Sequence, residues 1–395
     1  MTATRLLLHD TTRSVAASWP AKYVAAGLVD GLVVCLHNTP TDGAESSHLK
    51  GMTARRDGVL AESGRFLIDA CSHVDLSDVR IDTYEHWNLW PTGAVGDFVD
   101  QATYRAHVER TFDIQRSFGA PLMIPSPPLV RPDSDYAKAL LDAIGFGMSV
   151  AKESGDEPPI ITVAGSAPFW SAGKDLDRFF DSATKHRGGG WHLVPIQPSL
   201  SWPVELHLAE LTGMLRTTAT LALDHSFLFW ANADLMGLPL LAAGATHIGT
   251  GWDRKQRCLH PDSHKPIESE GGSWLGMVTL DRALVAVTEP AATQLEAQAP
   301  RLAAQTLPPN GTVPAAGGAR VSHHIGVLAR AAADLATHAP GEARSLHLLD
   351  TIYGRARRLV DRVEAESTAD RLAEKWLVTQ ENALEEWRDY EGWPP

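Results

Sequence analysis

The sequence contains few cysteines and no long apolar run. Its 395 residues include three cysteines, at positions 35, 71 and 258, and no two of them have Cys-x-x-Cys spacing. This pattern predicts neither a framework of disulfides nor a cysteine-rich zinc site. No apolar run approaches the roughly 20 residues that a membrane-spanning helix needs, and the N-terminus lacks the features of a signal peptide. We therefore expect a soluble, cytoplasmic protein that does not associate with a membrane.

The composition is that of a globular, acidic protein. Glycine and proline together make up about 14% of the chain, which excludes collagen-like, low-complexity and largely disordered chains. The 48 acidic residues outnumber the 35 basic ones and give a formal net charge of −13. Broad binding of nucleic acid needs positive charge to neutralise phosphates, so nucleic acid could bind only at a local basic site. Tryptophan and histidine, with 12 and 17 residues, are abundant; both occur in ligand pockets and in ordinary cores.

Short apolar segments alternate with helix-like segments along most of the chain. Continuous apolar runs are typical of parallel strands that are buried on both faces. Such runs occur at 31–37, 65–70, 121–125, 159–165, 192–197, 220–224 and 246–249, with an eighth candidate at 274–279. Amphipathic segments that predict helices occur at 97–118, 135–152, 175–185, 204–216 and 228–241. The alternation predicts an α/β protein with a (β/α)8 TIM-type barrel, and a doubly wound open sheet is the alternative.

Composition also divides the chain into three regions. Residues 1–289 would form the barrel, and residues 290–320 are rich in Pro, Ala and Gly, as linkers are. Residues 321–395 would form a C-terminal helical region with helices at 321–336, 342–366 and 369–390.

Ionisable residues follow several of the predicted strands, where the catalytic groups of a barrel lie. Asp69 and Asp224 end two of them. A carboxylate near the axis of a barrel must be paired, metal-bound or chemically used, unless it caps the following helix. Imidazole and carboxylate groups also suit divalent metals. A metal-dependent hydrolase that uses His37, Asp69, His73 and His225 is therefore one alternative.

A second candidate feature lies between residues 249 and 257. Backbone amides of a glycine-rich turn can bind an anion. The turn would consist of Gly249, Thr250 and Gly251, and the basic residues that could contact phosphate are Arg254, Lys255 and Arg257. A tight turn followed by a solvated basic stretch is the alternative. The indole of Trp252 could stack on a base.

Three segments, taken in order, resemble the tRNA-guanine transglycosylase superfamily, whose members are (β/α)8 barrels. They are RFLIDACSH at 65–73, HLVPIQPS at 192–199 and DLMGLPLLAAGATHIGTGW at 234–252. The resemblance implies that Asp69 and Gln197 hydrogen-bond the edge of a guanine or 7-deazaguanine base, and that Gly237 lines the same pocket. It also implies base exchange in tRNA or DNA by covalent catalysis, in which a carboxylate acts at the sugar C1′.

The sequence departs from this family in two respects. Gly249 stands where the family has its catalytic aspartate, so Asp224 or Asp253 would have to take that role. The cysteine-rich zinc site is also missing, because Cys258 stands alone. Members of the superfamily that act on DNA or belong to phage-defence gene clusters are similarly divergent. We expect a base-binding barrel without a cofactor; an inactive barrel that binds a protein partner or forms a homodimer through its C-terminal helices is a further alternative.

Overall fold

A computed structural model of the chain describes residues 5–10, 19–36, 47–74, 87–199, 206–224, 227–261, 276–307, 311–315 and 317–394. Within these ranges the side chains of residues 47–49, 254 and 255 are not described. Among the described helices, none combines the length and the apolar character that crossing a lipid bilayer requires.

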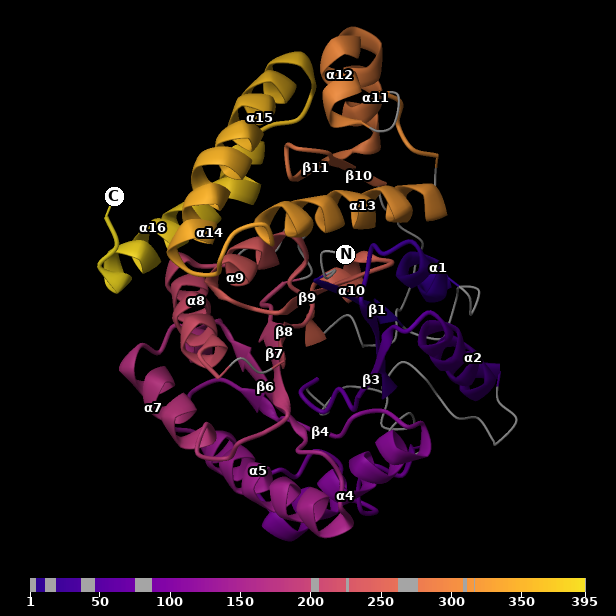
Figure 1. Cartoon of the computed structure of the whole chain (residues 1–395), viewed down its shortest axis with the longest axis vertical. Coiled ribbons are helices and arrows are strands. Elements are labelled where there is room, and N and C mark those ends of the chain that lie inside the picture. Colours follow the sequence, from indigo (N-terminus) through magenta and orange to yellow (C-terminus); the bar gives the residue numbers. More distant parts are fainter. Residues whose placement is uncertain are drawn as a thin grey trace.

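Parallel strands form a nearly closed eight-position barrel, as the sequence predicts (Figure 1). The strands are β1 (Leu6–Asp10), β2 (Gly31–Cys35), β3 (Arg65–Asp69), β4 (Met123–Ile124), β5 (Pro128–Leu129), β6 (Ile160–Ser166), β7 (Gly190–Ile196), β8 (Phe227–Trp230) and β9 (His247–Gly251). Their order is β3-β2-β1-β9-β8-β7-β6, and β4 and β5 share the eighth position because both pair with β6. All these ladders are parallel.

One side chain bridges the gap between β3 and β4, which no ladder joins among the described residues. Gln115 lies on helix α4 (Gln101–Ser117) and is fully buried. Its Nε2 donates to the carbonyl oxygens of Ile68, at 2.9 Å, and Met123, at 3.3 Å. Its Oε1 accepts a hydrogen bond from the N–H of Met123 at 2.9 Å. A side-chain amide therefore replaces the backbone ladder at this position.

The structure corrects three assignments of strands. β1 was not predicted, and the segment 220–224 is not a strand, because helix α8 (Leu208–Ala222) continues into it. The strand is instead β8, at the start of the predicted helix 228–241. The segment 274–279 contributes to β10 (Met277–Leu280), which pairs with β11 (Val285–Thr288) in a separate antiparallel sheet. A short apolar run fits a buried helix as well as a strand, which explains the error at 220–224.

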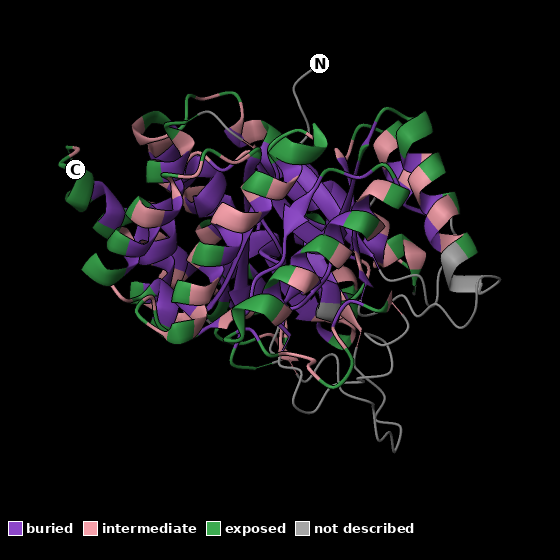
Figure 2. Cartoon of the chain, turned by 90° about the horizontal axis from the view of Figure 1, so that it is seen from below, coloured by how far each residue is buried: buried purple, intermediate pink, exposed green. Residues whose placement is uncertain are grey.

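Helices cover the outside of the barrel. They are α1 (Trp19–Ala25), α2 (Ser47–Ala61), α4, α5 (Asp135–Ser154), α6 (Ala167–Trp170), α7 (Lys174–Ala183), α8, α9 (Leu238–Ala243) and α10 (Arg254–Arg257), with the 3₁₀ turn η2 (Asp234–Gly237) before α9. Ser134 caps the start of α5, because its side chain accepts a hydrogen bond from Ala137 N. Gly155 caps the end of the helix in the left-handed conformation that favours glycine. Figure 2 shows buried strands inside and exposed residues on the outer helix faces.

The C-terminal region is helical and packs on the barrel. It comprises α11 (Glu289–Gln298), α12 (Pro300–Thr306), α13 (Gly318–Leu335), α14 (Glu342–Leu346), the π-helical segment η4 (His347–Tyr353), α15 (Gly354–Glu366), the π-helical segment η5 (Glu374–Val378) and α16 (Thr379–Glu391). Much of the range 290–320, predicted as a linker, is therefore helical. Helix α13 packs against α9 and β10, and α16 packs against α8 (Figure 1).

A buried polar network joins α13 to the barrel. Asp234 Oδ2 lies 2.9 Å from His324 Nε2 on α13 and accepts a hydrogen bond from Thr250 Oγ1 at 2.6 Å. Thr279 Oγ1 on β10 lies 2.8 Å from the other ring nitrogen of His324. Burial by itself would raise the pKa of Asp234, but His324, Arg257 and Thr250 lower it to about 2. A carboxylate of the barrel thus depends on the C-terminal region for its partner.

Candidate active site at the mouth of the barrel

Two histidines and a phenylalanine form a layer inside the barrel. His9 on β1 and His192 on β7 flank Phe229 on β8, and both imidazoles stack on its ring, with centroids 5.7 Å and 5.2 Å away. His192 is fully buried, and His9 is 8% exposed. A layer of side chains from several strands is the usual filling of such a barrel, but imidazole is an unusual choice for it. The layer is therefore a candidate for a role beyond packing.

Asp69 and His73 lie where β3 ends, at the mouth of the barrel. Both are buried, and Asp69 Oδ2 is 4.0 Å from His73 Nε2. Asp69 Oδ1 accepts a hydrogen bond from Cys71 N at 2.8 Å. One potential ligand atom from each of Asp69, Cys71 and His73 lies within 4.8 Å of the other two. This group combines the carboxylate, sulfur and imidazole that metal sites use.

Cys71 forms a disulfide with Cys35, the last residue of β2. The pair is separated by 36 residues, and its Cα atoms are 5.9 Å apart. The sequence did not predict this pair, because neither residue belongs to a recognisable cysteine motif. The two cysteines meet because β2 and β3 are adjacent, with Cys35 in register with Asp69.

Three buried polar atoms of this region have no hydrogen-bond partner among the described residues: His73 Nδ1, His192 Nε2 and Gln197 Oε1. The other nitrogen of His192 lies 3.3 Å from Thr162 Oγ1. Gln197 follows β7 directly, and its backbone N–H donates to Leu259 O at 2.8 Å. A buried polar atom without a partner is costly. These three atoms lie at strand ends or inside the barrel, and a polar ligand bound at this mouth would supply their missing hydrogen-bond partners.

Burial controls the charges of these groups. It lowers the pKa of His73 to about 3, and it lowers the pKa of His9 to about 3 with a further contribution from His73. It also lowers the pKa of His192 to about 4, although Asp69 acts in the opposite direction. Burial raises the pKa of Asp69. At neutral pH the three imidazoles are therefore uncharged. Each can donate a hydrogen bond from one ring nitrogen and accept one at the other.

Position 249, where the resemblance implies an aspartate, has no room for a side chain. A Cβ atom at Gly249 would overlap His9 Nε2 and would lie 2.8 Å from Asn232 N. His9 Nε2 itself accepts a hydrogen bond from Asn232 N at 3.1 Å, which holds the imidazole in this place. An imidazole from β1 therefore occupies the space that a residue larger than glycine would need on β9.

The glycine-rich stretch at 249–251 is not a turn. Gly249, Thr250 and Gly251 form the second half of β9 and pair with Leu7, Leu8 and His9 of β1. Their amides therefore belong to a strand and do not form the predicted cradle for a phosphate. Thr250 Oγ1 points to Asp234 rather than to a ligand.

The two carboxylates considered as replacements for the family aspartate differ in position. Asp224 lies between the end of α8 and the start of β8, so it is at the end of the barrel opposite to Asp69. The prediction that Asp224 ends a strand was wrong, and the two residues do not converge. Asp253 follows β9, is exposed, and accepts a hydrogen bond from Gln256 N at 3.1 Å at the start of α10. Asp253 is thus on the same side of the barrel as Asp69.

Other predicted site residues serve the packing of the barrel. Arg257 is 9% exposed, and its Nε donates to Gly251 O at 3.0 Å. Trp252 packs edge-on against Trp19, with ring centroids 5.3 Å apart. A Cβ atom at Gly237 would lie 2.8 Å from Ile248 Cγ2, so this glycine allows close packing of η2 on β9.

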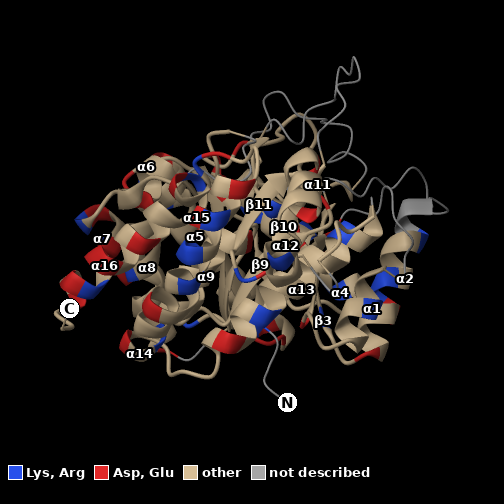
Figure 3. Ribbon diagram, turned by 90° about the horizontal axis from the view of Figure 1, so that it is seen from above, with Lys and Arg blue, Asp and Glu red and all other residues tan. Residues whose placement is uncertain are grey.

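Four predicted residues cannot be placed. The side chains of Arg254 and Lys255, and the residues His37 and His225, lie outside the described part of the chain. In the part that is described, Figure 3 shows basic and acidic residues interspersed over the outer helices. No basic face stands out among the described residues in this view.

The sequence did not single out His9 or His192 as candidates for the site. The run LLLHD at the N-terminus carries a signal, since three consecutive leucines precede a histidine and an aspartate. Five residues are too few to distinguish a strand from other apolar segments. His192 was inside a predicted strand, but an alternation of inward and outward side chains cannot be read from a continuous apolar run.

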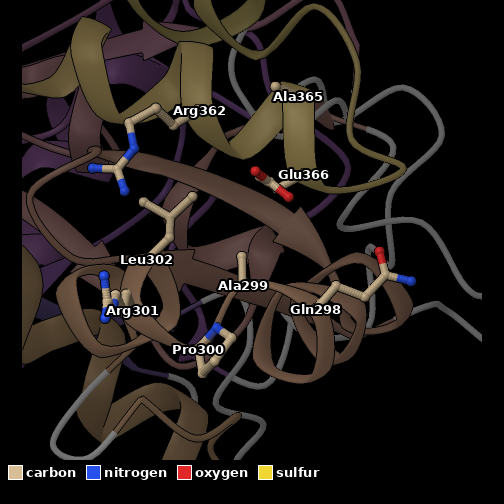
Figure 4. Close-up of a pocket in the computed structure, with 8 residues that line it drawn as sticks. All are labelled: Gln298, Ala299, Pro300, Arg301, Leu302, Arg362, Ala365 and Glu366. Atoms are coloured by element: carbon tan, nitrogen blue, oxygen red, sulfur yellow. The ribbon is translucent and has the colours of Figure 1, made fainter.

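Two cavities lie away from this mouth. One, of about 420 Å³, separates α11 and α12 from α15, and Figure 4 shows Arg362 and Glu366 on one side of it and Arg301 and Leu302 on the other. The other, of about 560 Å³, lies at the opposite end of the barrel, near Arg5. Neither is lined by a predicted site residue.

No family model and no curated protein matches the sequence. Among solved structures, an engineered protein from the Northeast Structural Genomics Consortium is 14% identical, with 63% of this chain and 64% of that chain covered and a TM-score of 0.36. A xylose isomerase-like TIM barrel/4-hydroxyphenylpyruvate dioxygenase fusion protein is also 14% identical, with coverage of 76% and 51% and a TM-score of 0.36. The chain thus spans less than two thirds of either protein, and its strand topology is what identifies it as a TIM-type barrel.

Proposed function

We propose that the mouth of the barrel binds the edge of a guanine-type base through Asp69 and Gln197. The unpartnered Oε1 of Gln197 is the observation that carries this proposal. A guanine edge offers N–H donors to this oxygen and to the carboxylate of Asp69, and a carbonyl oxygen to the Gln197 amide. The resemblance of the segments 65–73 and 192–199 to the tRNA-guanine transglycosylase superfamily supports the same pair of residues.

Base exchange requires a further group that acts at the sugar C1′. His9 occupies the space beside Gly249, and Asp224 lies at the opposite end of the barrel. We assign the role to Asp253, an exposed carboxylate that follows β9 on the side of the mouth. In this exchange on tRNA or DNA, the Asp253 carboxylate would attack C1′ while the bond from C1′ to the resident base breaks and that base leaves. The incoming base would then attack C1′ and release the carboxylate.

Binding can be tested by thermal unfolding with guanine and 7-deazaguanine. A ligand that binds only the folded state raises the melting temperature. The parent protein should show such a rise, and Asp69→Asn and Gln197→Met should abolish it. Asp142→Asn, which changes an exposed residue of α5, should keep it. Absence of a shift with both bases, or an undiminished shift in Asp69→Asn, would contradict base binding.

Exchange can be tested separately by incorporation of labelled guanine into tRNA and into DNA. Asp253→Asn should retain the thermal shift and lose incorporation. Incorporation by Asp253→Asn would reject the role of this residue. A thermal shift without incorporation by the parent protein would leave a barrel that binds the base without transferase activity.

A metal-dependent hydrolase is the second candidate, favoured by the proximity of Asp69 and His73, whose Oδ2 and Nε2 atoms are 4.0 Å apart. Two of its four predicted ligands, Asp69 and His73, lie together, while His37 and His225 are outside the described residues. This function predicts a stoichiometric divalent metal in the purified protein and a hydrolytic activity that a chelator removes. Full hydrolytic activity after complete removal of the metal would exclude it.

A further inference from the structure

We propose that Cys35, Cys71 and His73 form a binding site for a zinc-type metal ion when the disulfide between the two cysteines is reduced. The site would lie where β2 and β3 end. The proposal does not depend on base binding, because the proposed metal ligands do not include Gln197 and the bound metal itself is what the experiments measure.

The fold brings the two cysteines together from adjacent strands. Cys35 ends β2 in register with Asp69 of β3, and the Cα atoms of the two cysteines are 5.9 Å apart. Cys71 has a positive φ of 54°, which is uncommon for a residue other than glycine. Its N–H bonds to Asp69 Oδ1 at 2.8 Å and fixes the turn after β3. Two sulfurs that can reach one another can also reach one metal ion.

His73 supplies a third ligand to the same place. A ring nitrogen of His73 lies within 4.8 Å of Cys71 Sγ. The side chain is 2% exposed, and its Nδ1 has no partner among the described residues. A buried nitrogen without a partner is an independent sign that the region accommodates a ligand.

The sequence repeats the same short pattern at both strand ends. Cys35 and Cys71 are each followed by a histidine two positions later, at 37 and 73. His37 lies outside the described residues and is not part of the proposed set.

The ligand types select the metal. Two thiolates and an imidazole suit Zn²⁺ and Co²⁺, whereas Mg²⁺ and Ca²⁺ prefer oxygen ligands. Three protein ligands leave the fourth tetrahedral position open to water, as in catalytic zinc sites. Asp69 Oδ2, 4.0 Å from His73 Nε2, would lie beside the metal without being required as a ligand.

Metal binding and disulfide formation exclude one another chemically. A dithiol reductant transfers two electrons and two protons to the Cys35–Cys71 bond, which breaks to give two thiols while the reductant becomes a disulfide. Binding of the metal then releases two thiol protons. A small-molecule disulfide reverses the process: it takes two electrons from the two thiolates and becomes two small thiols, while the cysteines form the protein disulfide and release the ion.

The full-length protein can be titrated with Co²⁺ in its reduced and oxidised forms. The reduced form should bind one Co²⁺ per chain and show a thiolate-to-cobalt charge-transfer band with the visible bands of a tetrahedral ion. The oxidised form should show neither. Added Zn²⁺ should displace Co²⁺ and abolish the bands.

Matched variants identify the ligands. Cys35→Ser and Cys71→Ser should weaken the charge-transfer band and Co²⁺ affinity by about tenfold or more, and His73→Gln should weaken affinity. Cys258→Ser removes the buried cysteine outside the disulfide and should change nothing. Asp69→Asn should keep the band even though it loses base binding, so the two proposals fail separately.

Protection from alkylation tests the site without any substitution. In the reduced protein, Zn²⁺ should protect Cys35 and Cys71 from iodoacetamide, and a chelator should remove this protection. Equal Co²⁺ binding by the oxidised protein, a charge-transfer band in Cys71→Ser as strong as that of the parent, or alkylation unaffected by Zn²⁺ would overturn the proposal.

Discussion

The side-chain amide of Gln115 donates a hydrogen bond to the backbone carbonyl of Ile68, 2.9 Å away, and thereby links β3 to the helix that covers it. The same amide makes two hydrogen bonds with Met123 of β4. Gln115 therefore connects β3 and β4, the two strands at the ends of the otherwise continuous order of paired strands.

Replacement of Gln115 by Leu should destabilise the protein. The substitution keeps a side chain of similar size in the core but leaves buried backbone groups of Ile68 and Met123 without their hydrogen-bond partners. We expect this loss to lower the free energy of unfolding by about 2–4 kcal/mol. Urea unfolding measures the loss. Gln101→Ala, at the exposed start of the same helix, should have little effect, and equal stability of Gln115→Leu and the parent would show that the bridge is dispensable.

Glu210 should make the protein less stable as the pH rises. Burial raises the pKa of Glu210 to about 7, despite a hydrogen bond from the N–H of His207. Because the folded-state pKa is raised, its stabilising contribution is complete below the unfolded value of 4.5 and is lost as the pH rises through about 7. Glu210→Gln keeps an acceptor for His207 N. At about pH 8 this variant should melt at a higher temperature than the parent and have a free energy of unfolding larger by up to about 3 kcal/mol. At about pH 4 the two proteins should melt at the same temperature.

The control for this prediction is Glu153→Gln on α5, where the side chain is exposed. Its melting temperature should follow that of the parent at both pH values. If Glu210→Gln shows the same pH dependence as the parent, the carboxyl of Glu210 does not titrate in this range.

His192 should contribute to unfolding in acid. Burial lowers its pKa from 6.5 to about 4, so its stabilising contribution is present above pH 6.5 and is lost as the pH falls towards 4. His192→Gln cannot take up a proton, and its stability should fall less steeply over this interval. Chemical unfolding at a series of pH values gives the slope, with His338→Gln, outside the barrel, as the control. An unchanged slope in His192→Gln would contradict the prediction.

The sequence predicts the barrel best where apolar runs are flanked by helices. The strands β2, β3, β6, β7 and β9 were confirmed because their runs are apolar and end near polar residues. The segment 220–224 was predicted wrongly because its run is as apolar as a strand, whereas its first residues form the end of α8. β1 was missed because its five residues offer little pattern.

The candidate site was predicted only in part. Asp69, His73 and Gln197 were found because they follow recognisable strands, and the structure places them at or just beyond strand ends. His9 and the disulfide depend on which strands become neighbours, β1 with β9 and β2 with β3. Arg257 is turned inward and donates to Gly251 O, an orientation that the sequence does not reveal because a basic residue that faces solvent has the same sequence context.

The overlap between a Cβ at Gly249 and His9 Nε2 has a consequence for how this chain can change. A carboxylate cannot appear at position 249 through a single substitution, since the imidazole from β1 would have to leave first. The two positions, 240 residues apart in sequence, are therefore coupled: an acidic residue at 249 needs a smaller residue at 9 and also a shift of the Asn232 backbone, whose N would lie 2.8 Å from the new Cβ. Descent to or from an enzyme with an aspartate at this position would therefore pass through a change in the very first strand.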